Sequence, residues 1–241
     1  MKTASYIALG QNGIQMRHLD MIANNIANSS TNAFRGERAS FGSYMVRQPD
    51  GQTLSYVRDK GARLDTREGD LLATSNNMDV GIRGAGYLVA KTADGVAYTR
   101  NGRLRIDLER RLTTDSGRPL LGERGGEVRI DGDPSDMVIA RNGIVSVNGR
   151  QIDRLQVVKF DDEQSLQKTG DGLYTTDKTP APAPQAEIRQ GMIETSNVRP
   201  VVELTAMMAI VRNYQGAQNF LDGEHQRQLK AIRELPRADQ G

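Results

Sequence analysis

Two glycine- or aspartate-rich segments carry residue types that bind phosphate or calcium. Gly81–Gly86 resembles a nucleotide loop, but the third glycine of a dinucleotide fingerprint would fall on Val89, and a strand pattern follows where a helix is needed. Asp131–Asp136 alternates oxygen ligands as calcium loops do. The glycine and glutamate that such a loop needs are replaced by Asp136 and Asn142. We therefore interpret both segments as turns.

The remaining chemistry-bearing residues also predict no catalytic site. The chain has no cysteine, which excludes disulfides and thiolate metal sites. His18 and His225 are the only histidines, and two ligands do not make a zinc site. Asp161-Asp162-Glu163 is typical of a solvated charge run. We expect no enzyme activity, no metal, no cofactor and no small-molecule substrate.

Composition limits the classes of partner. The length of 241 residues allows one large core or two modest ones, and a composition that is 37% hydrophobic and 5% aromatic predicts that the core is lean. The 32 basic and 30 acidic residues are interspersed without a basic run, so we expect no nucleic-acid binding. No apolar segment is long enough to insert in a membrane, and the apolar run Tyr6–Leu9 is too short for a cleaved secretory signal.

The two ends of the chain have helical periodicity. Met16, Leu19, Ala23 and Ile26 recur at spacings of three and four, which predicts an amphipathic helix over about residues 3–28. Residues 28–32 are Asn, Ser and Thr, whose side chains compete for backbone hydrogen bonds and end the helix.

The C-terminal segment predicts a longer helix that starts near Pro200. One heptad stripe is apolar toward its two ends and polar in its middle, and a second apolar stripe lies beside it. The first consists of Val201, Leu204, Met208, Val211, Leu229 and Ile232, and the second of Met207, Ile210, Tyr214, Ala217 and Leu221.

Short apolar runs with frequent Asn-Gly and Asp-Gly turns fill the middle of the chain. This pattern favours an antiparallel sandwich or open barrel. The predicted fold class is α+β, with long terminal helices pairing as a coiled-coil-like stem. The predicted segments are an N-terminal helix and motif over 1–34, an extended connection over 35–80, a central all-β domain over 81–193 and a C-terminal helix over 194–241.

At the terminal helices the sequence resembles a known family. Residues 23–35 are similar to the A-N-N-x-A-N-x-x-T-x-G-F-K signature of the flagellar rod and hook proteins, with Ala33 where the pattern has glycine. Residues 190–198 resemble its Q-G-x-L-E-x-S-N-V motif. Residues 82–89 and 98–102 resemble the I-x-G-x-G-F-F-V and Y-T-R-x-G elements, so the likeness covers most of the chain.

The resemblance implies a structural subunit of the bacterial flagellar basal-body rod, which transmits torque across the periplasm. Chain length and the segment Thr3–Leu9 favour a proximal rod protein. A distal rod protein of the same family is the near alternative, and a monomeric β-sandwich binding module is the other. The implied partners are further copies, neighbouring rod proteins and the flagellar type III export apparatus. The implied location is the periplasmic rod, reached without a cleaved signal.

The resemblance also implies which residues make assembly contacts. Apolar contacts are expected at Leu19, Ile22, Ile26, Leu204, Met208, Val211 and Leu221. The motif residues Asn24, Asn25 and Asn28 are expected to cap helix ends and bridge to neighbours, together with Thr31, Phe34, Ser196, Asn197 and Val198. The alternative for each apolar position is the core of the monomer, and the sequence does not separate the two.

Overall fold

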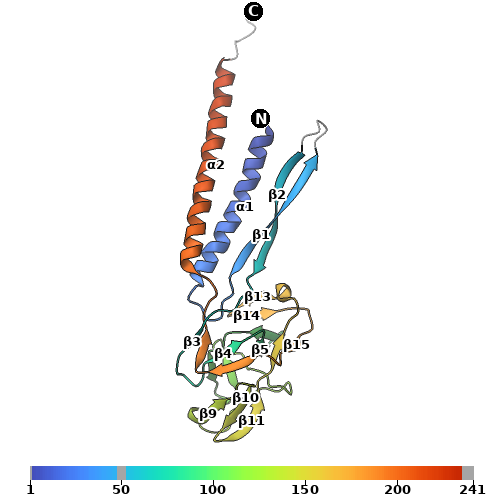
Figure 1. The fold of residues 1–241 in the computed structure, drawn as a ribbon, viewed down its shortest axis with the longest axis vertical. Coiled ribbons are helices and arrows are strands. Elements are labelled where there is room, and N and C mark those ends of the chain that lie inside the picture. The colour runs from blue at the N-terminus through green and yellow to red at the C-terminus, as the bar shows by residue number, and fades with distance from the viewer. Residues whose placement is uncertain (1, 48–52, 235–241) are drawn as a thin grey trace, which may run out of the picture. The chain divides into compact units, whose positions relative to one another are not determined.

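The computed structural model describes residues 2–47 and 53–234, which form two compact units (Figure 1). The helical unit comprises segments of Met1–Ala27, Glu37–Arg63 and Arg199–Gly241. The β unit comprises Asn28–Gly36 and Leu64–Val198. Residues 48–52 of the predicted extended connection and the end of the predicted C-terminal helix beyond residue 234 lie outside the described residues.

Two long helices and one hairpin build the helical unit. Helix α1 spans Lys2–Ala27 and helix α2 spans Pro200–Glu234, with proline at the first position, where a missing N–H costs nothing. Strands β1 (Glu37–Arg47) and β2 (Thr53–Leu64) pair with each other. Helix α1 contacts α2 on one side and β1 on the other (Figure 1).

The predicted coiled-coil-like stem is wrong. Leu204 and Met208, in the first of the two apolar stripes predicted on this helix, are 47% and 56% exposed and form no buried seam within the chain. The neighbouring stripe is turned inward instead, with Ile210 only 9% exposed. The segment expected to be an extended connection forms the β1–β2 hairpin, which packs with α1. Periodicity located two apolar stripes on α2, but it could not say which of them the chain itself would cover.

The β unit is antiparallel at every strand pair described within it. Its largest sheet has the order β13-β14-β6-β5-β12-β15, and a second sheet has the order β11-β10-β9. Strand pairs β16-β4, β17-β3 and β7-β8 complete the unit. The strands are β3 (Leu71–Ala73), β4 (Val80–Arg83), β5 (Tyr87–Thr92), β6 (Gly95–Thr99), β7 (Leu104–Ile106), β8 (Leu112–Thr114), β9 (Met137–Ile139), β10 (Ile144–Val147), β11 (Arg150–Arg154), β12 (Val157–Lys159), β13 (Gln167–Gly170), β14 (Leu173–Thr175), β15 (Ala181–Pro182), β16 (Glu187–Gln190) and β17 (Met192–Glu194).

Turn chemistry explains several of these hairpins. Asn148 and Gly149, which join β10 to β11, have φ of 51° and 74°, as the two central positions of a tight hairpin turn require. The main core contains aliphatic side chains from most strands, including Val80, Leu88 and Val145. A second cluster is aromatic and contains Tyr87, Tyr98, Phe160 and Tyr174. Within the described chain, neither α-helix combines the length and apolar content that crossing a bilayer requires.

Candidate functional site

Helix α2 presents an uncovered apolar stripe on the helical unit. Leu204 and Met208 belong to it, and Val201 and Val211 are 76% and 37% exposed. Leu221 is half-buried and belongs to the inward stripe. Monomeric proteins rarely leave a long apolar row in water, and such a row is the kind of surface that packs against another helix.

On α1 the predicted apolar contacts are largely covered by the same chain. Ile22 is 2% exposed, and Leu19 and Ile26 are half-buried. Asn24 is exposed at the surface of the helix. The structure therefore places the apolar residues of α1 mostly inside the unit and those of the first α2 stripe mostly outside it.

Asn25 connects the end of α1 to the start of β1. Its side-chain carbonyl accepts a hydrogen bond from the Glu37 N–H at 2.9 Å, and its Nδ2 donates to the Glu37 carbonyl at 2.8 Å. The side chain is almost fully buried. This amide therefore acts like a peptide group in a ladder and fixes the direction of the hairpin relative to the helix.

Within the β unit, the two halves of the motif meet at one junction. The Ala33 N–H donates to the Glu194 carbonyl at 2.8 Å, and the Asn197 N–H donates to the Phe34 carbonyl at 3.1 Å. The Asn197 side chain accepts from the Gly36 N–H at 2.8 Å and donates to the carbonyls of residues 65 and 67 at 2.9 Å each. One asparagine thus joins three chain segments.

The other motif residues surround this junction. The Thr31 hydroxyl donates to the Asn28 side chain at 3.3 Å, and Thr31 is exposed. The Phe34 ring lies 4.4 Å from the Lys168 ammonium group. Ser196 accepts from the Val198 N–H at 3.2 Å, and Val198 is buried.

Two buried arginines form ion pairs and hydrogen bonds next to this junction. Arg100 Nε lies 2.6 Å from a carboxylate oxygen of Glu194, and both side chains are essentially inaccessible to water. The Arg100 guanidinium also donates to the carbonyls of Ile82, Gly84 and Gly86 at 2.8–3.0 Å. This pair was not predicted from the sequence. The only indication in the sequence is that Arg100 and Glu194 are charged residues next to otherwise apolar strand patterns.

Arg35 is the second buried arginine. Its Nη1 lies 2.6 Å from Glu163 and donates to the Tyr87 hydroxyl at 2.8 Å. Glu163 belongs to the acidic run that the sequence analysis interpreted as solvated, and the structure instead uses it as a partner for a buried cation. A buried charge is tolerated only when it is paired and hydrogen-bonded, as here.

Ala33 occupies a backbone conformation that favours glycine. Its φ is 53°, and the residue is buried. For an L-residue with a Cβ this conformation costs about 1–2 kcal/mol. We expect Ala33→Gly to raise the free energy of unfolding by about 1 kcal/mol, measured by urea denaturation. Asn148→Gly is the matched control, because asparagine tolerates its φ of 51° and the gain should be smaller. A less stable Ala33→Gly protein would show that methyl packing outweighs the strain.

Buried tyrosines predict alkaline instability. Burial raises the pKa of Tyr174 to about 12, and burial also raises the pKa of Tyr87 and Tyr98. The unfolded value is about 10, so the folded unit is fully stable below that pH and loses stability as pH rises toward the folded values. Tyr87 and Tyr174, whose pKa values are raised most, each add a slope of about 1.4 kcal/mol per pH unit in this window. Unfolding midpoints measured between neutral and alkaline pH, together with phenolate absorbance, should show this fall in stability.

In Tyr174→Phe the fall in stability per pH unit should be smaller. An unchanged fall would contradict the assignment of the alkaline instability to buried tyrosines.

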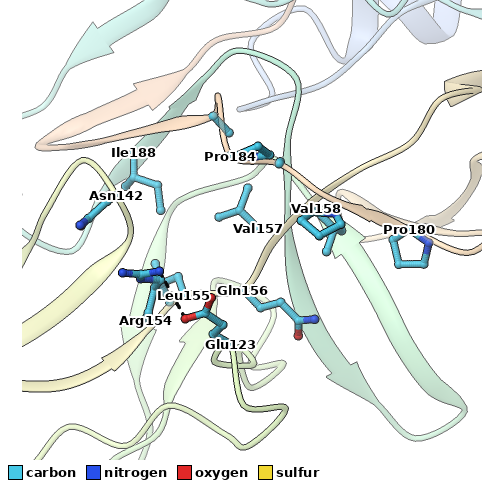
Figure 2. A pocket seen from close by; sticks show the side chains of 13 residues that line it. Glu123, Asn142, Arg154, Leu155, Gln156, Val157, Val158, Pro180, Pro184 and Ile188 are labelled. Carbon is cyan, nitrogen blue, oxygen red and sulfur yellow. Dashed lines mark ion pairs between the residues drawn. The ribbon is translucent and has the colours of Figure 1, made fainter.

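The segments first considered for chemistry have structural roles. Asp133 accepts from the Ser135 N–H at 2.9 Å and starts a 3-10 turn over Pro134–Asp136. Gly84 has a φ of 88° and turns the chain after β4. Among residues 2–47 and 53–234, no cluster of three potential metal ligands is found. A cavity of 520 Å³ on the β unit is lined mainly by apolar and proline residues, with the Glu123–Arg154 pair beside it (Figure 2).

Comparison with known proteins shows which family models and which proteins this chain is similar to. Residues 81–147 match the model of the flagellar hook protein FlgE/F/G D1 domain, and residues 189–234 match that of the flagellar basal body rod FlgEFG protein C-terminal region. The flagellar basal-body rod protein FlgF of Caulobacter vibrioides is 33% identical over 98% of both chains. FlgF of Salmonella typhimurium is 30% identical over 89% of this chain and 91% of its own. The flagellar basal-body rod protein FlgG of Buchnera aphidicola subsp. Schizaphis graminum is 32% identical over 83% of this chain and 87% of its own.

Proposed function

The chain belongs to the family of flagellar basal-body rod proteins and is a structural subunit of the rod, and we propose that the exposed stripe of α2 joins it to neighbouring subunits. The observation that carries this proposal is the difference in exposure between the two apolar stripes of α2. The inward stripe is covered by the chain itself, whereas Val201, Leu204, Met208 and Val211 are left in water. Helices of adjacent subunits would cover this second face and gain the hydrophobic free energy of its burial.

The remaining motif residues are proposed to have two roles, one within a subunit and one between subunits. Asn25, Phe34, Asn197 and Val198 hold elements of one subunit in place, as their contacts indicate. The exposed Asn24 and Thr31, with Asn28, Leu19 and Ile26, are proposed to contribute to subunit contacts. Ile22 is buried and Leu221 and Ser196 are half-buried, so these three are proposed to stabilise the single subunit.

The proposal also includes the position of the subunit in the rod and the route by which the subunit reaches it. The Caulobacter FlgF relative covers more of this chain than the Buchnera FlgG relative does, 98% against 83%, which supports a proximal position over a distal one. The subunit would reach the periplasm unfolded through the flagellar export apparatus. Its work there is transmission of torque, which requires packed surfaces and no catalytic group.

The test is to purify hook–basal bodies from the source cells and identify their proteins by mass spectrometry. We expect this chain in the particle, at fewer copies than the distal rod protein. A copy number equal to or above that of the distal rod protein would contradict the proximal position. Absence of the chain from intact particles would overturn the role in the rod.

A further inference from the structure

One leucine of the β unit is fully exposed at the tip of a hairpin. Leu108 lies in the turn between β7 and β8 and has a relative exposure of 101%. It therefore contacts almost nothing in its own chain. Leaving a large apolar side chain in this position forgoes the hydrophobic free energy of its burial. A partner that covers the side chain would recover this free energy.

The turn that carries Leu108 is held rigid on both sides. The Asp107 carboxylate accepts from the Arg111 N–H at 2.8 Å and from Arg111 Nε at 2.7 Å, and Arg111 also pairs with Glu109 at 2.7 Å. Arg110 donates from Nε to the Ile130 carbonyl at 2.8 Å and from its second terminal nitrogen to Gly132. A rigid turn loses little conformational entropy on binding, so Leu108 is preorganised as an anchor.

The same unit has a cavity of matching character. Its volume of 520 Å³ falls in the usual range of binding pockets, about 300–1,000 Å³. Figure 2 shows Val157 in the middle of the lining, with Ile188 and Pro184 toward one side and the Arg154–Glu123 pair toward the other. Prolines on the β15 side stiffen that wall, because their φ angles are fixed.

The Leu108 side chain, called the knob below, and the cavity have residues of opposite charge beside them. Glu109 beside the knob has a side chain that is 63% exposed, and Arg154 at the cavity is 41% exposed. Arg154 is only loosely paired with Glu123, because the 3.4 Å between its terminal nitrogen and the carboxylate exceeds the about 2.7–2.9 Å of a strong charge-assisted hydrogen bond. A carboxylate arriving with the knob would complete the environment of this guanidinium.

We propose that Leu108 of one copy inserts into this cavity on the β unit of the next copy, with Glu109 facing Arg154. The inference rests on the proposed rod function, which supplies neighbouring copies. Knob and cavity share no residue, so the contact is head-to-tail. A head-to-tail contact that does not close produces a helical array, the geometry a shaft requires.

Cysteine cross-linking in assembled basal bodies tests the contact, and the cysteine-free chain provides a clean background. The test variant combines Leu108→Cys with Gln156→Cys, which lines the cavity. The matched control combines Val138→Cys, an exposed β9 position, with Gln156→Cys. After oxidation we expect disulfide-linked multimers of this chain at about tenfold the control level, as neighbouring thiols at high effective concentration give.

The outcomes separate this inference from the proposed function. Particles that contain the doubly substituted chain but yield no multimers above the control overturn the knob-and-cavity contact and leave the rod assignment intact. A link only to a protein of different mass overturns the second copy as the partner. Absence of the unsubstituted chain from particles overturns both. As a second variant, Leu108→Asp should reduce motility and leave the thermal unfolding midpoint unchanged; full motility would contradict the contact.

Discussion

Cells that carry Leu204→Asp should lose swimming motility, while the purified subunit remains folded. Leu204 is 47% exposed on α2, so aspartate there disrupts little within one copy. It also lies one turn from the N-terminus of α2, where a negative charge interacts favourably with the helix dipole. In an assembled rod the same carboxylate would be buried unpaired against another subunit, which costs far more than an apolar contact gains. The measurements are a soft-agar swimming assay and thermal unfolding of the purified protein.

Two variants of the same helix serve as controls. Leu204→Met keeps an apolar side chain of similar volume, and motility should be retained. Asn213→Asp adds the same charge nine residues away, about half a turn around the helix, and should be tolerated. Normal swimming in the Leu204→Asp strain would contradict the role of the exposed stripe. An unfolded subunit would instead assign Leu204 to the core of the monomer.

Local patterns in the sequence predicted local structure well. The Asn-Gly and Asp-Gly pairs encode positive φ angles directly, so the β10–β11 and β13–β14 turns at Asn148-Gly149 and Asp171-Gly172 follow from residue type. Helix periodicity likewise located the apolar stripes of α2. What such patterns could not give is the identity of the element that covers each stripe, because this depends on contacts between residues far apart in the chain.

The β1–β2 hairpin shows why one element was missed. Its strands are rich in Arg, Ser and Gly, and Gly61 has a φ of 88°, so the alternation expected of a half-buried strand is interrupted. The buried pair of Arg100 and Glu194 was missed for a different reason. The two residues are 94 positions apart, and nothing in either local pattern identifies the partner. Only the fold brings them to 2.6 Å.

That buried pair gives the second large prediction, which concerns stability. Glu194→Gln should lower the free energy of unfolding by about 3 kcal/mol, because it removes the carboxylate at 2.6 Å from the buried Arg100 and leaves only the partly exposed Glu68 carboxylate at 3.9 Å. The Glu194 carboxylate accepts from Arg100 Nε at 2.6 Å and from the Gly69 N–H at 3.0 Å. Glutamine has one acceptor oxygen, so one of these donors would face an NH₂ group. Such a loss is a large part of a typical total of about 5–15 kcal/mol.

Urea denaturation of Glu194→Gln and of Glu123→Gln, a matched control, would measure this difference. Glu123 is paired with Arg154 at 3.4 Å, and both side chains are substantially exposed, so its loss should change stability by less than about 1 kcal/mol. Equal effects of the two substitutions would show that burial does not determine what the Arg100–Glu194 pair contributes. A selective loss in Glu194→Gln would explain why the chain keeps two charges in its core. They tie the end of β17 to the residue that follows β6 within the β unit, where the Glu194 backbone carbonyl also accepts from the Ala33 N–H at 2.8 Å.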